Sequence, residues 1–288
     1  MGDNGNHPGV RAVEVRKRTP GSVPILILAG LFVAATFLAW YFSWFGRELS
    51  DADISKYLAD QNNPRHVQHA LLQIQQRIER GEATSKNWYP ELIALSGSSE
   101  TEFRLTVAWL MGFDNTVPQF HESLLKLVKD SEPIVRRNAA LALVRFNDSS
   151  GHEELVSILK PYAVTAPAAG VVASSLREGL AMTRGTLLAR IKQQDGNVAE
   201  VRSPLPGRIQ KLIKTDGAPV SQGDEVLSLN SDENSIWEAL RGLALIGTPG
   251  DVSVIDGYAN ATDVSSRVRS QAKSAINAIQ SRTADLSK

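Results

Sequence analysis

Two segments of the chain repeat one helical pattern, and this repetition constrains the fold more than any other feature. Residues 130–146 read DSEPIVRRNAALALVRF, and residues 263–279 read DVSSRVRSQAKSAINAI. In both segments an Asp precedes a Val by five residues, an Arg follows the Val, and small or apolar residues recur at the spacing of one helical face. The residues that define the repeat are Asp130, Val135, Arg136, Asp263, Val268 and Arg269.

Similar amphipathic segments recur at a near-constant interval. Their first apolar residues are Val67, Phe103, Val135, Ile236 and Val268, with spacings of 36, 32, 101 and 32 residues. Second helices are expected between them, at residues 89–95, 117–128, 153–159 and 252–258. A helix pair repeated about every 30 residues is typical of an α-solenoid, whose units stack on their neighbours. The alternative is a helical bundle with accidental spacing, but the matched motifs and the shared interval favour the solenoid.

The Asp…Val-Arg…Ala…Ala-Leu pattern resembles HEAT-type repeats. The resemblance covers about residues 50–161 and 234–282, and it is strongest in the two matched segments. It implies that a buried Asp and an Arg tie successive units together.

The long interval of 101 residues, between the helices that begin at Val135 and Ile236, contains two copies of a different pattern. Residues 163–191 and 200–230 each hold a Pro, then Gly residues at matching offsets, then an apolar pair. Short β-rich runs with Gly between them predict strands joined by tight turns, where Gly supplies positive φ. The predicted turn glycines are Gly170, Gly179, Gly185, Gly207, Gly217 and Gly223. A duplication of this kind implies two interlocked, pseudo-symmetric halves.

The pattern APxxG…EG…GxLL resembles the biotinyl/lipoyl superfamily, which has the barrel-sandwich hybrid fold, and the equivalent domain of membrane fusion proteins. The likeness covers residues 162–233, and removing them from the interval leaves 29 residues, close to one repeat. It therefore indicates an insertion into the solenoid. In the carriers a modified Lys lies in the central hairpin, but here Gly196 lies near that position. Lys192, about four residues away, is the only candidate acceptor, and we expect no cofactor.

Residues 23–45 form an uncharged run, VPILILAGLFVAATFLAWYFSWF, which predicts a transmembrane helix. A cleavable signal peptide is disfavoured, because the run is long and ends in bulky aromatic residues. Basic residues before the run and acidic residues after it predict a disordered cytoplasmic tail at 1–22 and an extracytoplasmic bulk. The expected location is a single-pass protein of a bacterial inner membrane, with the lipid bilayer as one partner.

Composition and motifs exclude several functions. The formal net charge of zero argues against nucleic-acid binding, and the absence of Cys excludes thiolate chemistry and Cys-based metal sites. His66 and His69 have no acidic residue at helical spacing that completes a metal motif. No phosphate-binding loop or nucleophile elbow occurs, so no catalytic, metal or cofactor residue is predicted and the chain is not expected to be an enzyme.

The sequence thus predicts a multi-domain α + β chain, in which a membrane helix precedes a HEAT-like α-solenoid interrupted by a small all-β barrel-sandwich hybrid. The expected domains are residues 1–22, 23–45, 46–161, 162–233 and 234–288. The function that fits is a membrane-anchored, non-enzymatic scaffold or adaptor that docks protein partners of a cell-envelope complex. Two alternatives remain open. One is a truncated periplasmic adaptor of an export pump, without the long helical hairpin of such adaptors, and the other is a carrier that uses Lys192.

Overall fold

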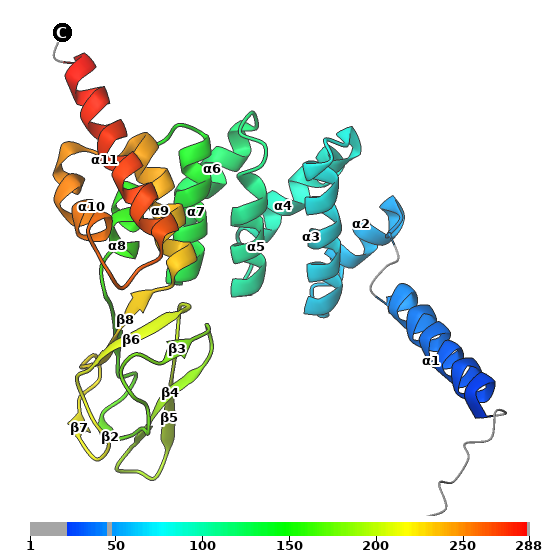
Figure 1. The fold of residues 1–288 in the computed structure, drawn as a ribbon, viewed down its shortest axis with the longest axis horizontal. Helices are drawn as coiled ribbons and strands as arrows, with labels where there is room; N and C mark the ends of the chain where they lie inside the picture. Colours follow the sequence, from blue (N-terminus) through cyan, green and yellow to red (C-terminus); the bar gives the residue numbers. More distant parts are fainter. Residues whose placement is uncertain (1–21, 45–47, 287–288) are drawn as a thin grey trace, which may run out of the picture. The chain divides into compact units, whose positions relative to one another are not determined.

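The computed structural model describes residues 22–44 and 48–286 (Figure 1). The chain divides into two units, Met1–Ser50 and Asp51–Lys288, and each is described here by itself. The predicted tail lies outside the described residues apart from its last position.

In the first unit, helix α1 spans Ser22–Trp44 and coincides closely with the predicted membrane segment. The prediction that this segment crosses a membrane is nevertheless wrong for the part of the chain that the structure describes, where no helix is both long and apolar enough for a membrane span. The transmembrane part of the predicted fold and the single-pass location are corrected accordingly.

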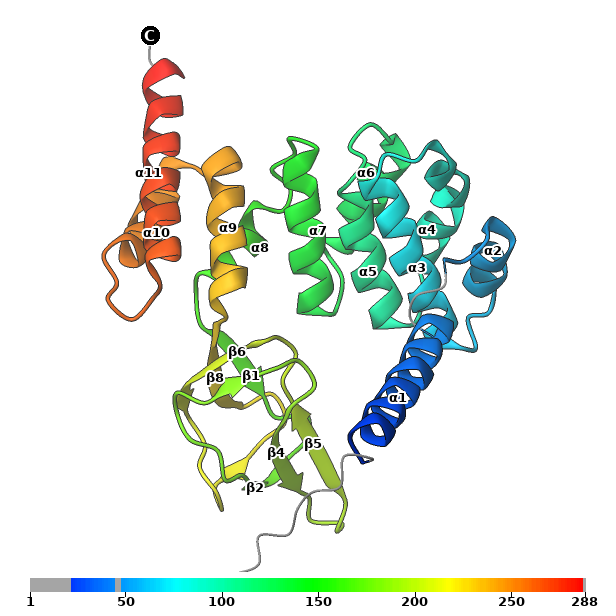
Figure 2. The same ribbon diagram turned by 45° about the vertical axis from the view of Figure 1, so that its right-hand side comes forward.

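The second unit contains a row of paired helices. The longer helices α3, α5, α7, α9 and α11 stand side by side in that order, and neighbours in the row contact each other (Figures 1 and 2). The helices of this unit are α2 (Asp51–Ala59), α3 (Pro64–Glu79), η1 (Ala83–Trp88), α4 (Tyr89–Leu95), α5 (Thr101–Met111), α6 (Pro118–Leu127), α7 (Pro133–Arg145), α8 (His152–Ile158), α9 (Glu233–Ile246), η2 (Pro249–Asp251), α10 (Val252–Ala259) and α11 (Ser266–Leu286).

Proline begins several of these helices. Pro64, Pro118 and Pro133 are the first residues of α3, α6 and α7. Proline suits the first helical position because that N–H has no partner within the helix, and because its fixed φ is already helical. The four predicted second helices are confirmed as α4, α6, α8 and α10, with ends that differ by no more than one residue.

The apolar face predicted from periodicity forms the core of the helical row. Val135 and Val268 are fully or almost fully buried, as the repeat requires. One cluster of buried residues joins α7 and α8 to α9, α10 and α11, and it includes Leu155, Leu240 and Ile255. The row therefore continues without a break in its core, although the chain between α8 and α9 makes a separate domain of strands.

The β domain consists of two four-stranded antiparallel sheets, with strand orders β1-β8-β6-β3 and β5-β4-β2-β7. Its strands are β1 (Tyr162–Thr165), β2 (Gly170–Ala173), β3 (Ala181–Met182), β4 (Leu187–Lys192), β5 (Val198–Arg202), β6 (Gly207–Leu212), β7 (Pro219–Val220) and β8 (Glu225–Ser231). Each sheet takes two strands from each sequence copy. Strands β1 to β4 belong to the first copy and β5 to β8 to the second. The counterparts β1 and β5, β2 and β6, β3 and β7, and β4 and β8 always lie in different sheets, so the predicted interlocking of two halves is confirmed.

The predicted turn glycines fall into two groups. Gly179, Gly185, Gly217 and Gly223 have φ between +80° and +88°, as the turns require. Gly170 and Gly207 instead begin strands β2 and β6. A Cβ atom on Gly170 would lie 2.4 Å from the carbonyl oxygen of Lys192, and one on Gly207 would lie 2.3 Å from that of Asn230. These two glycines are needed for close backbone approach rather than for positive φ, and they occupy equivalent places in the two halves.

Candidate protein-interaction site

The first feature of the repeat is an ion pair between successive units. Arg104 in α5 donates from Nε and Nη2 to the two carboxylate oxygens of Asp130, at 2.7 and 3.0 Å. Burial disfavours the charge on Asp130, but the hydrogen bonds from Arg104 and from the backbone N–H of Glu132 outweigh it and hold the pKa of Asp130 below its usual value. Asp130 thus joins two units, as the HEAT resemblance implies.

The other predicted repeat residues make different contacts. Arg136 donates to Glu154 at 2.9 Å, and it also donates to the backbone carbonyl of Asp130 at 2.8 Å. Arg269 donates to the backbone carbonyl of Val264, within its own unit. Asp263 is exposed. The position in α9 that corresponds to Arg104 holds Trp237, so the arginine that would reach this Asp is absent.

A second set of inter-unit contacts was not predicted. Three side chains, from the second helices α4, α6 and α8, each reach an Asp in the connection between the two helices of the next unit. The pairs are Tyr89–Asp114 at 2.9 Å, His121–Asp148 at 2.7 Å and His152–Asp251 at 2.7 Å.

The signal for this set was present in the sequence, because Tyr89, His121 and His152 are 32 and 31 residues apart. It was missed because the first member is a Tyr, which conceals the repetition. Burial and then the neighbouring Asp114 raise the pKa of Tyr89 to about 12. The hydroxyl therefore stays protonated and donates to the carboxylate.

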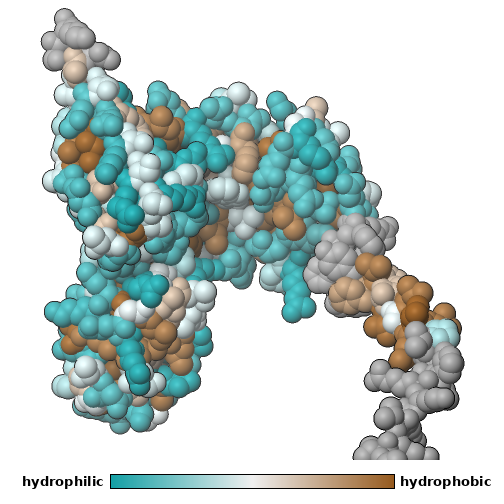
Figure 3. Space-filling view, viewed as in Figure 1, coloured by the Kyte–Doolittle hydropathy of each residue, from teal (hydrophilic) through white to brown (hydrophobic). Residues whose placement is uncertain are grey.

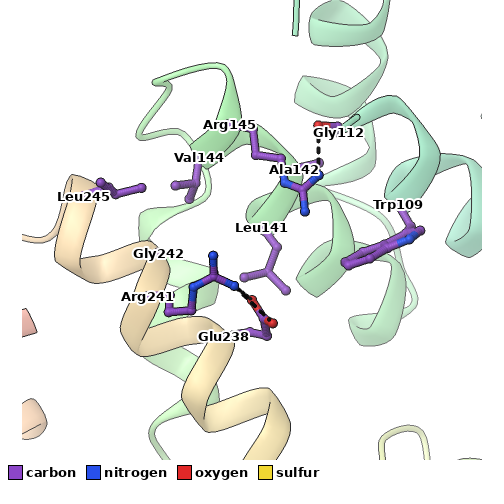
Figure 4. Close-up of a pocket in the computed structure, with 10 residues that line it drawn as sticks. All are labelled: Trp109, Gly112, Leu141, Ala142, Val144, Arg145, Glu238, Arg241, Gly242 and Leu245. Atoms are coloured by element: carbon purple, nitrogen blue, oxygen red, sulfur yellow. Dashed lines mark hydrogen bonds and ion pairs between the residues drawn. The ribbon is translucent and has the colours of Figure 1, made fainter. Parts of the chain in front are cut away.

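A groove crosses α5, α7 and α9 on the helical row (Figure 4). It is lined by apolar, arginine and small side chains, namely Trp109, Gly112, Leu141, Ala142, Val144, Arg145, Glu238, Arg241, Gly242 and Leu245. The deepest part is a pocket of about 100 Å³. Gly242 in this lining permits close packing of α9 on α8, since a Cβ atom there would lie 2.7 Å from a methyl carbon of the buried Leu155.

Aromatic rings and guanidinium groups pair at both ends of the groove. At one end Arg145 lies over the rings of Trp109 and Phe113, at 5.5 and 4.9 Å from their centroids. At the other end the lining residue Arg241 lies 4.7 Å from the ring centroid of Trp237, which is outside the lining and also carries Arg267 at 3.7 Å. Stacking on an aromatic ring holds a cation by attraction to the ring quadrupole.

Apolar groups complete the surface between these ends. Leu245 is 64% exposed, although it is a large hydrophobic residue. Figure 3 shows apolar residues as separate brown patches among hydrophilic ones over the helical row. Trp and Arg are the residue types most enriched in the parts of interfaces that carry binding energy. The groove was not predicted, because it forms where three helices meet and the sequence repeat marks only the core face of each helix. Its lining combines exposed residues such as Arg241 and Leu245 with the buried Gly112, Ala142, Val144 and Gly242.

The residues that bear on cofactor or metal binding are placed as follows. Lys192 is the last residue of β4, pairs with Val198 and Val171, and is exposed. The turn beyond it holds Gly196 with φ of 84°. His66 stacks on Tyr57 at 4.2 Å and contacts Asp60 at 2.8 Å. Within the described ranges, no group of three or more His, Asp or Glu side chains is arranged to hold a metal ion.

Comparison with known proteins supports the helical-repeat assignment. The family model described as HEAT repeats matches residues 89–181. The matched range begins at α4, covers the pairs α5–α6 and α7–α8, and ends in β3. The second unit is thus a helical-repeat region with a β-sheet domain, and the matched part is similar to HEAT repeats, which generally mediate protein–protein interaction.

Two further comparisons add little. No match is found among curated proteins. Among solved structures, the chain is similar to part of a single-chain, multi-domain long-chain acyl-CoA carboxylase, with 21% identity and a TM-score of 0.24. The likeness covers 31% of this chain and 10% of that one. At this TM-score it supports no statement about fold or function.

Proposed function

We propose that this protein is a non-enzymatic scaffold that binds protein partners through the groove across α5, α7 and α9. The observation that carries the proposal is the Trp- and Arg-rich surface on a row of HEAT repeats, with Leu245 exposed at its edge. Stacked helical repeats present extended surfaces for other proteins. Function in such folds depends on the site rather than on the fold, and this site has the composition of a binding surface.

The size of the pocket supports a protein ligand over a small-molecule substrate. Sites for drug-sized ligands usually measure about 300–1,000 Å³. The pocket here is about 100 Å³, which suits one side chain of a partner. Its two ionisable groups with opposite charge, Glu238 and Arg241, are paired at 3.2 Å. This pairing supports a role in binding rather than in acid–base chemistry.

Affinity purification tests the proposal. The full chain with a C-terminal tag is isolated from its native cells, alongside a variant with Leu245→Ala and Trp109→Ala. We expect a reproducible set of proteins that accompanies the unmodified chain and is depleted with the variant. A matched control carries Leu72→Ala in α3, where a leucine is 49% exposed outside the groove. If the unmodified chain is recovered alone in repeated preparations under mild cross-linking, the proposal fails.

We further infer that the β domain is of the biotinyl/lipoyl-like, barrel-sandwich hybrid type and serves as a second docking module. The duplicated topology supports this inference, as do the equivalent close approaches of Gly170 and Gly207. A structure determined by experiment tests it: superposition on a lipoyl domain must align all eight strands in the same order. A different order of strands would contradict the inference that the β domain is biotinyl/lipoyl-like.

A carrier role for Lys192 is the second candidate function. One observation favours it, namely that Lys192 is exposed at the end of β4, next to the hairpin that joins the two halves. Against it, Lys192 lies in the paired strand instead of at the turn. The intact mass of protein purified from its native cells separates the two functions. A mass equal to that of the unmodified chain excludes the carrier role, whereas an added biotinyl or lipoyl group on Lys192 establishes it.

A further inference from the structure

We propose that the groove binds an acidic peptide segment of a partner protein and that the pocket takes one bulky apolar side chain from it. This inference rests on the proposed scaffold function and specifies the chemistry of the ligand. Three features carry it: the volume of the pocket, the balance of charge around it, and the way in which its arginines are held.

The pocket has the size and lining for a single apolar anchor. Its volume of about 100 Å³ is of the order of one large side chain. Leu141, Val144 and Leu245 supply apolar walls, and Gly112 and Gly242 complete the lining. Burying a Leu or Phe side chain in such a site is favourable because it removes apolar surface from water. A chain segment that enters the groove therefore gains most from one bulky apolar residue.

Charge around the pocket selects acidic neighbours for that anchor. Two guanidinium groups line the groove, those of Arg145 and Arg241, and a third, that of Arg267, lies over the same Trp237 ring as Arg241. The acidic residue in the lining is Glu238, which pairs with Arg241. The described lining and its stacked arginines thus leave a surplus of positive charge. Potentials across protein interfaces are complementary, so a partner segment rich in Asp and Glu fits this surface and a basic one is repelled.

The arginines are also prepared for carboxylate binding. Arg241 and Arg267 are stacked on Trp237, and Arg145 is stacked on Trp109 and Phe113. Arg145 donates from Nη1 to the carbonyl of Gly112 at 3.3 Å, which fixes one end of its planar group. A guanidinium group has five N–H donors, so others remain for a bidentate carboxylate. Because stacking already orders these side chains, binding costs less conformational entropy than it does with free arginines.

Selection from a phage-displayed library of short random peptides, with the full chain immobilised, tests the inference. We expect the selected peptides to carry one Leu, Phe or Trp flanked by Asp or Glu. Synthetic copies of these peptides are then titrated against the full chain and its variants by fluorescence anisotropy. Leu245→Ala and the double variant Arg241→Glu with Arg267→Glu should each weaken binding about tenfold. Binding should also weaken as the salt concentration rises, because exposed charges are screened.

Matched controls outside the groove are Leu72→Ala and Arg65→Glu, both at exposed positions of α3, and they should bind as the unmodified chain does. Circular dichroism shows whether each variant is folded, and Arg241→Gln replaces the double variant if that one is not. Selected peptides that are neutral or basic, or that bind the groove variants unchanged, overturn the inference but leave the scaffold function standing. A selection that enriches no peptide also overturns it. The scaffold function itself fails only in the purification experiment, so the two failures are distinct.

Discussion

His152 and Asp251 form a hydrogen bond of 2.7 Å although they are 99 residues apart in the chain. The same contact joins His121 to Asp148, which are 27 residues apart, at the same distance. The imidazole Nε2 faces a carboxylate oxygen in both pairs. The interface between units is therefore built in the same way whether or not the β domain intervenes, and the insertion leaves the stacking of repeats unchanged.

Replacement of His152 should destabilise the C-terminal units. Its side chain is partly buried and its partner Asp251 is almost fully buried, so His152→Ala leaves a carboxylate with one bond fewer. We expect a loss of about 1–2 kcal/mol in the free energy of unfolding. Urea unfolding followed by circular dichroism measures it, with Lys160→Ala at an exposed position as the control. Equal stability of the two variants would show that the pair contributes nothing.

The free energy of unfolding should decrease in acidic solution, below about pH 4. Burial opposes the charge on Asp251, but bonds from His152 and Thr248 outweigh it, and the pKa of Asp251 lies below its usual value. The pKa of Asp148 is lowered in the same manner. A depressed pKa in the folded state stabilises the fold at pH above the unfolded value of about 3.9, and that contribution is lost as pH falls through the folded pKa.

The urea midpoint should therefore decrease as pH is lowered below about 4. Asp251→Asn should weaken this dependence, because the variant lacks one of the groups that titrate. A pH profile of Asp251→Asn that is parallel to that of the unmodified chain contradicts the assignment.

The ion pair between Arg104 and Asp130 should contribute more than an exposed pair. Both side chains are largely buried, at 13% and 9% exposure, and two hydrogen bonds join them. In a double-mutant cycle with Arg104→Gln and Asp130→Asn, we expect a coupling energy of about 1–2 kcal/mol. The exposed pair of Arg202 and Glu200 serves as the comparison, for which less than about 0.5 kcal/mol is expected. An equal coupling energy in both pairs would show that burial does not strengthen the pair of Arg104 and Asp130.

Two glycine substitutions in the β domain should distinguish the cost of a steric clash with a neighbouring strand from the cost of a positive φ. Gly207→Ala places a Cβ atom against the carbonyl of Asn230, and the backbone must shift, at a cost of about 1–3 kcal/mol or more. Gly196→Ala has open space around it and meets only the strain of positive φ, about 1 kcal/mol. Hydrogen exchange of strands β6 and β8 should show faster opening in Gly207→Ala than in Gly196→Ala. The reverse order would contradict the packing argument.

The repeat periodicity predicted the core of this protein well, because burial of one helical face imposes the spacing that makes Val135 and Val268 recognisable. Strand duplication was equally visible, since equivalent turns require equivalent glycines. The roles of Gly170 and Gly207 could not be predicted from the sequence, because close backbone approach is a tertiary contact. The groove lined by Trp109 and Arg241 was not predicted for a similar reason, because it is assembled from residues of three helices that are far apart in the sequence.

The β domain begins and ends at two neighbouring points. Tyr162 in its first strand pairs with Leu229 in its last, so the two connections to the helical row are about 5 Å apart at that level. A gap of this size is closed by very few residues. We therefore expect that a short linker between α8 and α9 can replace the whole domain without rearrangement of the helices on either side.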